Sequence, residues 1–177
     1  MSESMERLAA RLGALEDRNA VQAVVIDIAA GVDRHDVALL RASIWPDAHI
    51  DMGGPDAVTG EAFASALAPP PKPARGRMHL TGNYRIRLEG DRAEAESHVL
   101  SCQEAAGADG DETRVRAGRY LDHFERRDGV WKLSRRVFVD EWSRLDPVGR
   151  QPNVGSRRSA PAPNDAAYVE LSLGGGR

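Results

Sequence analysis

The chain has 177 residues, a mass of 19.2 kDa and a formal net charge of -3, with 24 basic against 27 acidic residues. This near balance gives no electrostatic reason to expect a nucleic acid or an acidic membrane surface as partner. A single cysteine, Cys102, excludes an internal disulfide and a cysteine-rich metal site. Because no apolar run approaches the ~20 residues of a membrane span, we expect a cytoplasmic protein.

The N-terminal third is patterned for helices. Over residues 5–32 the apolar side chains recur three or four positions apart, which is typical of one buried helix face; they are Leu8, Leu12, Leu15, Val21, Val24, Val25, Ile28 and Val32. Asp17 or Asn19 could cap a second helix, so a break near them is compatible with the pattern. Shorter helices are expected over 37–44, ended by the proline that follows Trp45, and over 61–67.

Alternating apolar and polar residues predict strands in the rest of the chain. The expected strands cover residues 49–52, 78–88, 92–103, 115–126 and 130–142, with loops over the prolines at 69–73 and over 105–111. Asp128-Gly129 between the last two strands is the strongest short-range signal for a hairpin. Helices first and antiparallel strands afterwards predict an α+β fold. A curved sheet wrapped around the helices would form a cone with a pocket at its mouth.

The composition changes near residue 146. Prolines 147, 152, 161 and 163 and five glycines follow that point. Such a segment cannot bury a core of its own. We therefore expect a domain over 1–145 and an arm over 146–177.

Four stretches together resemble the SnoaL-like branch of the nuclear transport factor two-like superfamily. They are Gly31-Val32-Asp33-Arg34-His35-Asp36, Trp45-Pro46-Asp47-Ala48, His79-Leu80-Thr81-Gly82-Asn83, and Gly118-Arg119-Tyr120 continuing through Glu125 to Lys132. That branch includes scytalone dehydratase, bile-acid 7α-dehydratase and a hexachlorocyclohexane dehydrochlorinase. The resemblance covers about residues 14–142. It implies the cone-shaped fold, but says less about the reaction, since one fold hosts many functions.

In the lyases of this family an aspartate at the end of the long helix and a histidine on the first long strand form a dyad. The resemblance places these roles on Asp33 and His79. The carboxylate would hold one ring nitrogen and leave the other free to move a proton. It also implies that Arg136 helps a departing group or holds an oxygen anion.

Ile28 departs from the family pattern. The dehydrochlorinase has a lysine five positions before the aspartate, and relatives often have a tyrosine there, whereas Ile28 can neither donate nor accept a hydrogen bond. This argues against halide elimination by the same arrangement. Tyr120 could supply a hydroxyl instead, and Ile50 and Met52 are expected on the apolar side of the pocket. His49 and Asp51 share the opposite strand face, but their spacing is weak evidence for a metal site, so no metal and no cofactor are expected.

Two classes of function follow. The first is a cofactor-independent lyase or isomerase acting on an apolar small molecule, with polycyclic or steroid-like compounds among the candidates and loss of water as the favoured reaction. The second is a binding or assembly module of the same fold without chemistry, including a role like that of the β subunit of ring-hydroxylating dioxygenases. In either case the open sheet face predicts a homo-oligomer, a dimer or a trimer.

Overall fold

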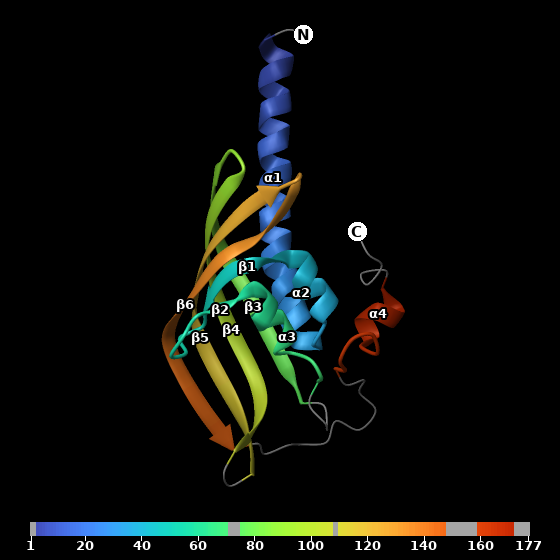
Figure 1. Cartoon of the computed structure of the whole chain (residues 1–177), viewed down its shortest axis with the longest axis vertical. Coiled ribbons are helices and arrows are strands. Elements are labelled where there is room, and N and C mark those ends of the chain that lie inside the picture. Colours follow the sequence, from blue (N-terminus) through green and yellow to red (C-terminus); the bar gives the residue numbers. More distant parts are fainter. Residues whose placement is uncertain (1–2, 71–74, 108–109, 148–158, 172–177) are drawn as a thin grey trace.

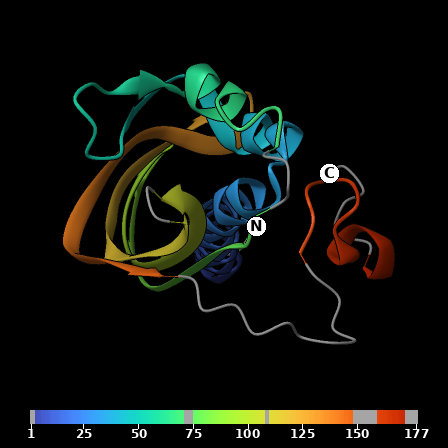
Figure 2. The same cartoon turned by 90° about the horizontal axis from the view of Figure 1, so that it is seen from below.

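The computed structural model describes residues 3–70, 75–107, 110–147 and 159–171. A curved sheet wraps around a long N-terminal helix, and short helices lie across one opening of the sheet (Figures 1 and 2). The fold is therefore the expected α+β cone. Within the described ranges, none of the helices combines the length and the apolar character that crossing a bilayer requires.

Ten elements follow one another along the chain. They are α1 (Glu3–Arg34), α2 (Val37–Ser43), β1 (Ile44–Asp51), β2 (Val58–Thr59), α3 (Gly60–Ser65), β3 (Arg77–Glu89), β4 (Arg92–Gly107), β5 (Gly110–Arg127), β6 (Val130–Pro147) and α4 (Ala166–Glu170). The strand order in the sheet is β2-β1-β6-β5-β4-β3. Every neighbouring pair is antiparallel except β1 and β6, which run parallel. The sheet is therefore antiparallel, as expected, except at this one pair.

The turn between β5 and β6 forms as its sequence predicts. Asp128 and Gly129 both have positive φ, 51° and 79°, which is the conformation that a two-residue type I′ hairpin requires. The β5–β6 pairing then brings Asp122 opposite Arg136 and Tyr120 opposite Phe138. The hairpin thus fixes which side chains of β5 and β6 meet inside the cone.

The hydrophobic core lies between the C-terminal half of α1 and the concave face of the sheet. Fully buried side chains from α1, α2, β1, β5 and β6 meet there, among them Val21, Val25, Ile28, Leu40, Ile44, Ile50, Phe124 and Leu133. Burying such side chains stabilises a fold by roughly 1.5–3 kcal/mol each relative to exposure. The core therefore anchors residues 21–34 of α1 firmly against the sheet.

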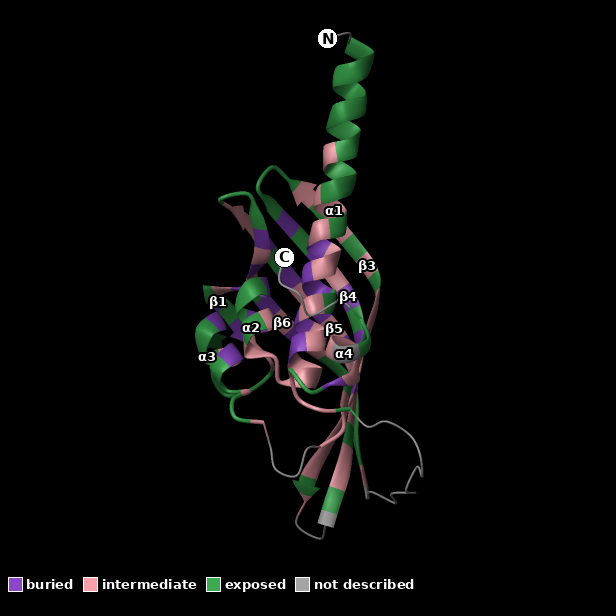
Figure 3. Cartoon of the chain, turned by 90° about the vertical axis from the view of Figure 1, so that its right-hand side faces the viewer, coloured by how far each residue is buried: buried purple, intermediate pink, exposed green. Residues whose placement is uncertain are grey.

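The first half of α1 differs from the expected packing. The helix runs unbroken through Asp17 and Asn19, and its first turns extend beyond the sheet (Figure 1). Figure 3 shows this segment as mostly exposed. Leu8, Leu12 and Leu15 are 58%, 55% and 59% exposed, so the expectation that they face the core was wrong.

Two further boundaries lie away from their predicted places. Strand β1 begins at Ile44 and runs through Pro46, where the pairing with β6 shifts register between Ile44 and His49. A proline is tolerated at such an irregularity because no ladder hydrogen bond from its nitrogen is needed. Within the loop expected over 105–111, β4 continues to Gly107 and β5 starts at Gly110, so the described residues there are strand; residues 108 and 109 lie outside the described ranges.

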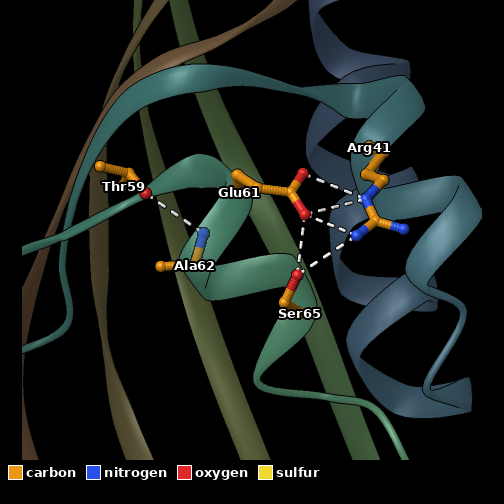
Figure 4. A network of polar contacts seen from close by, with 5 residues as sticks. All are labelled: Arg41, Thr59, Glu61, Ala62 and Ser65. Carbon is orange, nitrogen blue, oxygen red and sulfur yellow. Dashed lines mark hydrogen bonds and ion pairs between the residues drawn. The ribbon is translucent and has the colours of Figure 1, made fainter.

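A polar cluster joins α2 to α3. Arg41 on α2 donates to the Glu61 carboxylate, and Ser65 donates to the same carboxylate (Figure 4). Thr59 caps α3 by accepting from the backbone N–H of Ala62. Hydrogen bonding to Arg41, followed by that to Ser65, lowers the pKa of Glu61 to about 2. These contacts hold α3 beside the opening of the cone.

Candidate active site

Asp33 and His79 meet at the end of α1, as the resemblance implied. The Nδ1 atom of His79 lies 2.6 Å from one carboxylate oxygen of Asp33, and the backbone N–H of His79 donates to the other oxygen at 2.9 Å. The His79 side chain is 7% exposed and that of Asp33 18%. Asp33 therefore holds both the ring and the backbone of one strand residue.

This geometry selects one tautomer of the His79 ring. An ionised carboxylate only accepts hydrogen bonds, so the short contact places a proton on Nδ1. In the neutral ring Nε2 is then the bare nitrogen, and the described residues offer it no hydrogen-bond partner. A carboxylate that fixes a histidine in this way leaves Nε2 ready to take a proton.

His79 opens onto a cavity of about 240 Å³ between α1, α3 and the concave face of the sheet. Its lining is mostly apolar, with a few convergent polar groups; the residues are Ile28, Ala29, Val32, Met52, Phe63, Leu67, Arg77, His79, Gln103, Tyr120 and Arg136. This mixture is characteristic of small-molecule sites. Larger hollows of about 490 and 660 Å³ occur along β3, β4 and β5, but charged side chains such as Arg87 and Glu94 line them.

Arg136 lies in the cavity wall with its charge already balanced. Its Nε and one terminal nitrogen donate to the two oxygens of Asp122 at 2.8 and 2.7 Å, and both side chains are almost fully buried. Burial by itself would lower the pKa of Arg136, but the Asp122 charge outweighs it and the pKa is raised. Arg136 and Asp122 thus form a buried ion pair without net charge. The N–H groups of Arg136 that do not bond to Asp122 stay outside this pair.

Tyr120 stacks under this pair. The Arg136 guanidinium lies 3.8 Å from the centroid of the Tyr120 ring, and the ring is 5% exposed. Burial raises the pKa of the Tyr120 hydroxyl, and this effect outweighs the lowering by the nearby Arg136 charge. The hydroxyl therefore stays protonated and can donate to a ligand, and no described residue takes that hydrogen bond.

The remaining predicted lining residues separate in the structure. Ile28 and Met52 line the cavity. Ile50, two positions before Met52, is 1% exposed and packs in the hydrophobic core instead. Among the described residues no group of three or more histidine, cysteine, aspartate or glutamate side chains could hold a metal ion.

Two polar residues of the cavity were not predicted. Arg77 lies two positions before His79 on β3 and pairs in register with Gln103 on β4, so strand alternation places all three on one face. Arg77 donates to the backbone carbonyl of Val32 at 3.2 Å. Burial lowers the pKa of its guanidinium, and the Asp33 charge partly offsets this. The two-residue alternation of side chains along β3, counted from His79, could have indicated Arg77 as a residue of the same face.

The comparisons with known proteins agree with this architecture. Residues 13–137 match the family described as SnoaL-like domain. The chain belongs to the SnoaL-like family. The match spans well over half of the chain. It includes most of α1, the whole of β3, β4 and β5, and both Asp33 and His79.

Several solved structures are similar to this chain over most of its length. A type 2 hexachlorocyclohexane dehydrochlorinase is 24% identical with a TM-score of 0.70, covering 81% of this chain and 99% of that one. The type 3 enzyme from Novosphingobium barchaimii is 25% identical with a TM-score of 0.68, covering 80% and 99%. A scytalone dehydratase-like protein from Novosphingobium aromaticivorans is 19% identical with a TM-score of 0.63, covering 82% and 97%. No curated protein matches the chain.

Proposed function

We propose that this chain is a lyase or isomerase in which His79, oriented by Asp33, transfers a proton on a small, mostly apolar molecule. The observation that carries the proposal is the 2.6 Å contact between the two side chains beside an apolar cavity. The dehydrochlorinases and the scytalone dehydratase-like protein among its structural neighbours are consistent with lyase chemistry. Positioned acid–base groups of this kind contribute about 10²–10⁴-fold to a rate.

Loss of water is the reaction that we propose. Nε2 of His79 takes a proton from a carbon next to an activating group, and the electrons of that C–H bond form the new double bond. The C–O bond of the neighbouring carbon breaks, and the departing oxygen receives a proton from the His79 imidazolium and leaves as water. The protonated Tyr120 hydroxyl is placed in the same cavity and would hydrogen-bond to an oxygen of the substrate.

The size of the cavity refines the substrate class. At about 240 Å³ it lies below the roughly 300–1,000 Å³ of sites for drug-sized ligands. A molecule the size of a single ring fits this volume better than the polycyclic or steroid-like substrate that the sequence suggested. Ile28 replaces the polar residue of the dehydrochlorinase pattern, so elimination of halide is not proposed.

The test is a screen of small hydroxylated ring compounds for loss of water, with Asp33→Asn and His79→Gln as variants. Each variant should lose about 10²-fold or more of kcat, while Met52→Leu, a change of similar volume in the same wall, should keep most of it. Equal turnover in wild type and both dyad variants would overturn the proposal.

A second function is favoured by two observations in the cavity. Ile28 removes a polar group, and Asp122 already neutralises Arg136. A module that binds a ligand without changing it, or that assembles with a catalytic subunit, needs neither a polar side chain at position 28 nor an unpaired charge on Arg136. Tight binding of a compound that is recovered unchanged after long incubation would support this alternative.

A further inference from the structure

One solvent-facing side of α1 carries a regular stripe of mostly apolar residues. Its positions follow alternating spacings of three and four residues and are Met5, Leu8, Leu12, Leu15, Asn19, Gln22 and Ile26. This is the heptad pattern of a coiled coil, in which the stripe occupies the a and d positions. The five apolar members are 47–59% exposed, so nothing in the described part of this chain covers them.

The stripe faces away from the chain's own core. The residues of α1 that pack on the sheet are Val21, Val24, Val25, Ile28 and Gly31, and they lie on another side of the helix from Asn19, Gln22 and Ile26. Met5, Leu8 and Leu12 also precede residues 13–137, which match the SnoaL-like domain. The stripe is therefore separate from the core of the cone, and its first three members lie outside the matched domain.

We propose that the stripe is a dimerisation seam, and that its occupant is α1 of a second copy of this chain in a parallel, in-register coiled coil. Figures 1 and 3 show that the first turns of α1 extend clear of the sheet, so a second helix can lie beside them. The core holds the C-terminal half of α1 in a helical conformation. The exposed half therefore extends a helix that is already nucleated.

The charges beside the stripe identify the partner and its direction. In this heptad Arg11 occupies a g position and Glu16 the e position five residues later. A parallel pair places Arg11 of each chain beside Glu16 of the other, giving two attractive contacts. In an antiparallel pair g positions meet g positions and e positions meet e positions, so Arg11 would not lie beside Glu16 and both attractive contacts would be lost. Neither residue forms an ion pair with the described part of its own chain.

Asn19 favours a coiled coil of two helices in this register. A single asparagine at an a position of a coiled coil bonds to its counterpart on the partner and specifies register and oligomer state at some loss of stability. Asn19 is exposed and lies between the apolar positions Leu15 and Ile26. A slip by one heptad would place Asn19 against an apolar a position, where its amide would be unsatisfied.

Cysteine cross-linking tests the seam directly. In a Cys102→Ser background, Leu12→Cys at an a position should form a covalent dimer under mild oxidation, because a meets a across a parallel pair within the roughly 4.4–6.8 Å that a disulfide spans between Cα atoms. The matched control is Ala10→Cys, at an f position on the same turn, and it should remain uncross-linked. Equal cross-linking of the two variants, or none in either while the fold is intact, would overturn the proposal.

Charge reversal tests the direction and the partner. By sedimentation equilibrium, Arg11→Glu alone and Glu16→Arg alone should each weaken dimerisation by about tenfold, since two attractive contacts become repulsive. The double variant, or an equimolar mixture of the two single variants, should restore it. Glu6→Arg, at a b position, is the control and should leave the dimer unchanged. A mass of a monomer or a trimer, or a dimer indifferent to these charges and held instead through the exposed Met78 and Leu80 of the sheet, would contradict the proposal.

Discussion

Replacing Arg136 by methionine removes a charge that is 3% exposed and leaves the Asp122 carboxylate, 2% exposed, without its partner. Removing one member of a buried ion pair costs about 3–5 kcal/mol, because the other charge is left in a poorly solvated site. Domains are typically stable by roughly 5–15 kcal/mol, so this is a large fraction of the total. With a urea dependence of about 1–3 kcal/mol per molar, the unfolding midpoint should fall by about 2 M.

Urea unfolding followed by tryptophan fluorescence measures this loss, since Trp131 is buried in the core. Arg136→Met combined with Asp122→Leu removes both charges and should recover most of the stability. Arg116→Met is the matched control, because Arg116 and Asp140 form a partly exposed pair on the same two strands, and such pairs contribute about 0–1 kcal/mol. If Arg136→Met lost no more than Arg116→Met, or if the double variant lost the sum of its single changes, buried charge would not be the cause.

Three other predictions concern the polar contacts around the opening of the cone. The stability that Glu61 contributes is present above its ordinary pKa and is lost as the pH falls toward about 2. Carboxyl NMR should show that low midpoint, and Arg41→Ala should raise it toward the ordinary range, with the Ser65 hydrogen bond keeping it somewhat low. Burial, and then the hydrogen bond to Asp36, raise the pKa of Tyr168, so its contribution is present below the ordinary tyrosine pKa of about 10 and is lost at higher pH; ultraviolet titration should show one late phenolate that Tyr168→Phe removes. A chain ending at residue 147 should change ligand affinity or oligomer size more than Tm, and loss of the whole fold would contradict this.

The basis for the last prediction is how residues 159–171 dock. The backbone N–H of Ala162 donates to the Arg34 carbonyl at 2.7 Å, and Arg34 pairs with Asp165. The Tyr168 hydroxyl donates to Asp36 at 2.6 Å. The segment therefore contacts the C-terminal end of α1 and the N-cap of α2, just after Asp33. A separate arm over 146–177 stays a prediction.

Features that depend on neighbouring residues in sequence were predictable. Asp128-Gly129 forms its hairpin because both residues tolerate positive φ, and the buried face of α1 follows from Val21, Val25 and Ile28. The Asp33–His79 pair needed the family resemblance, since nothing local indicates that residues 46 positions apart meet.

Features that depend on register or on a second molecule were not predictable in the same way. Predicting the pairing of Asp122 with Arg136 requires knowledge of the β5–β6 register. Without that register, the sequence is equally compatible with Arg136 as a solvated charge on the strand. The apolar periodicity of Leu8, Leu12 and Leu15 correctly indicates a helix, but periodicity cannot say whether the face is buried within one chain or between two. The long β4–β5 hairpin passes through a Gly- and Ala-rich stretch whose local preference is for a loop, and its strand pairing overrides that preference.

The tautomer of His79 tests the central claim, that Asp33 prepares this ring for proton transfer, without any substrate. Nitrogen chemical shifts of ¹⁵N-labelled histidine distinguish a protonated ring nitrogen from a bare one, and His79→Gln assigns the signals. We expect neutral His79 to carry its proton on Nδ1 and to lose this preference in Asp33→Asn, while the signals of His98 stay in place. A neutral His79 protonated on Nε2 in the wild type, or a ring unaffected by Asp33→Asn in an intact fold, would contradict the account.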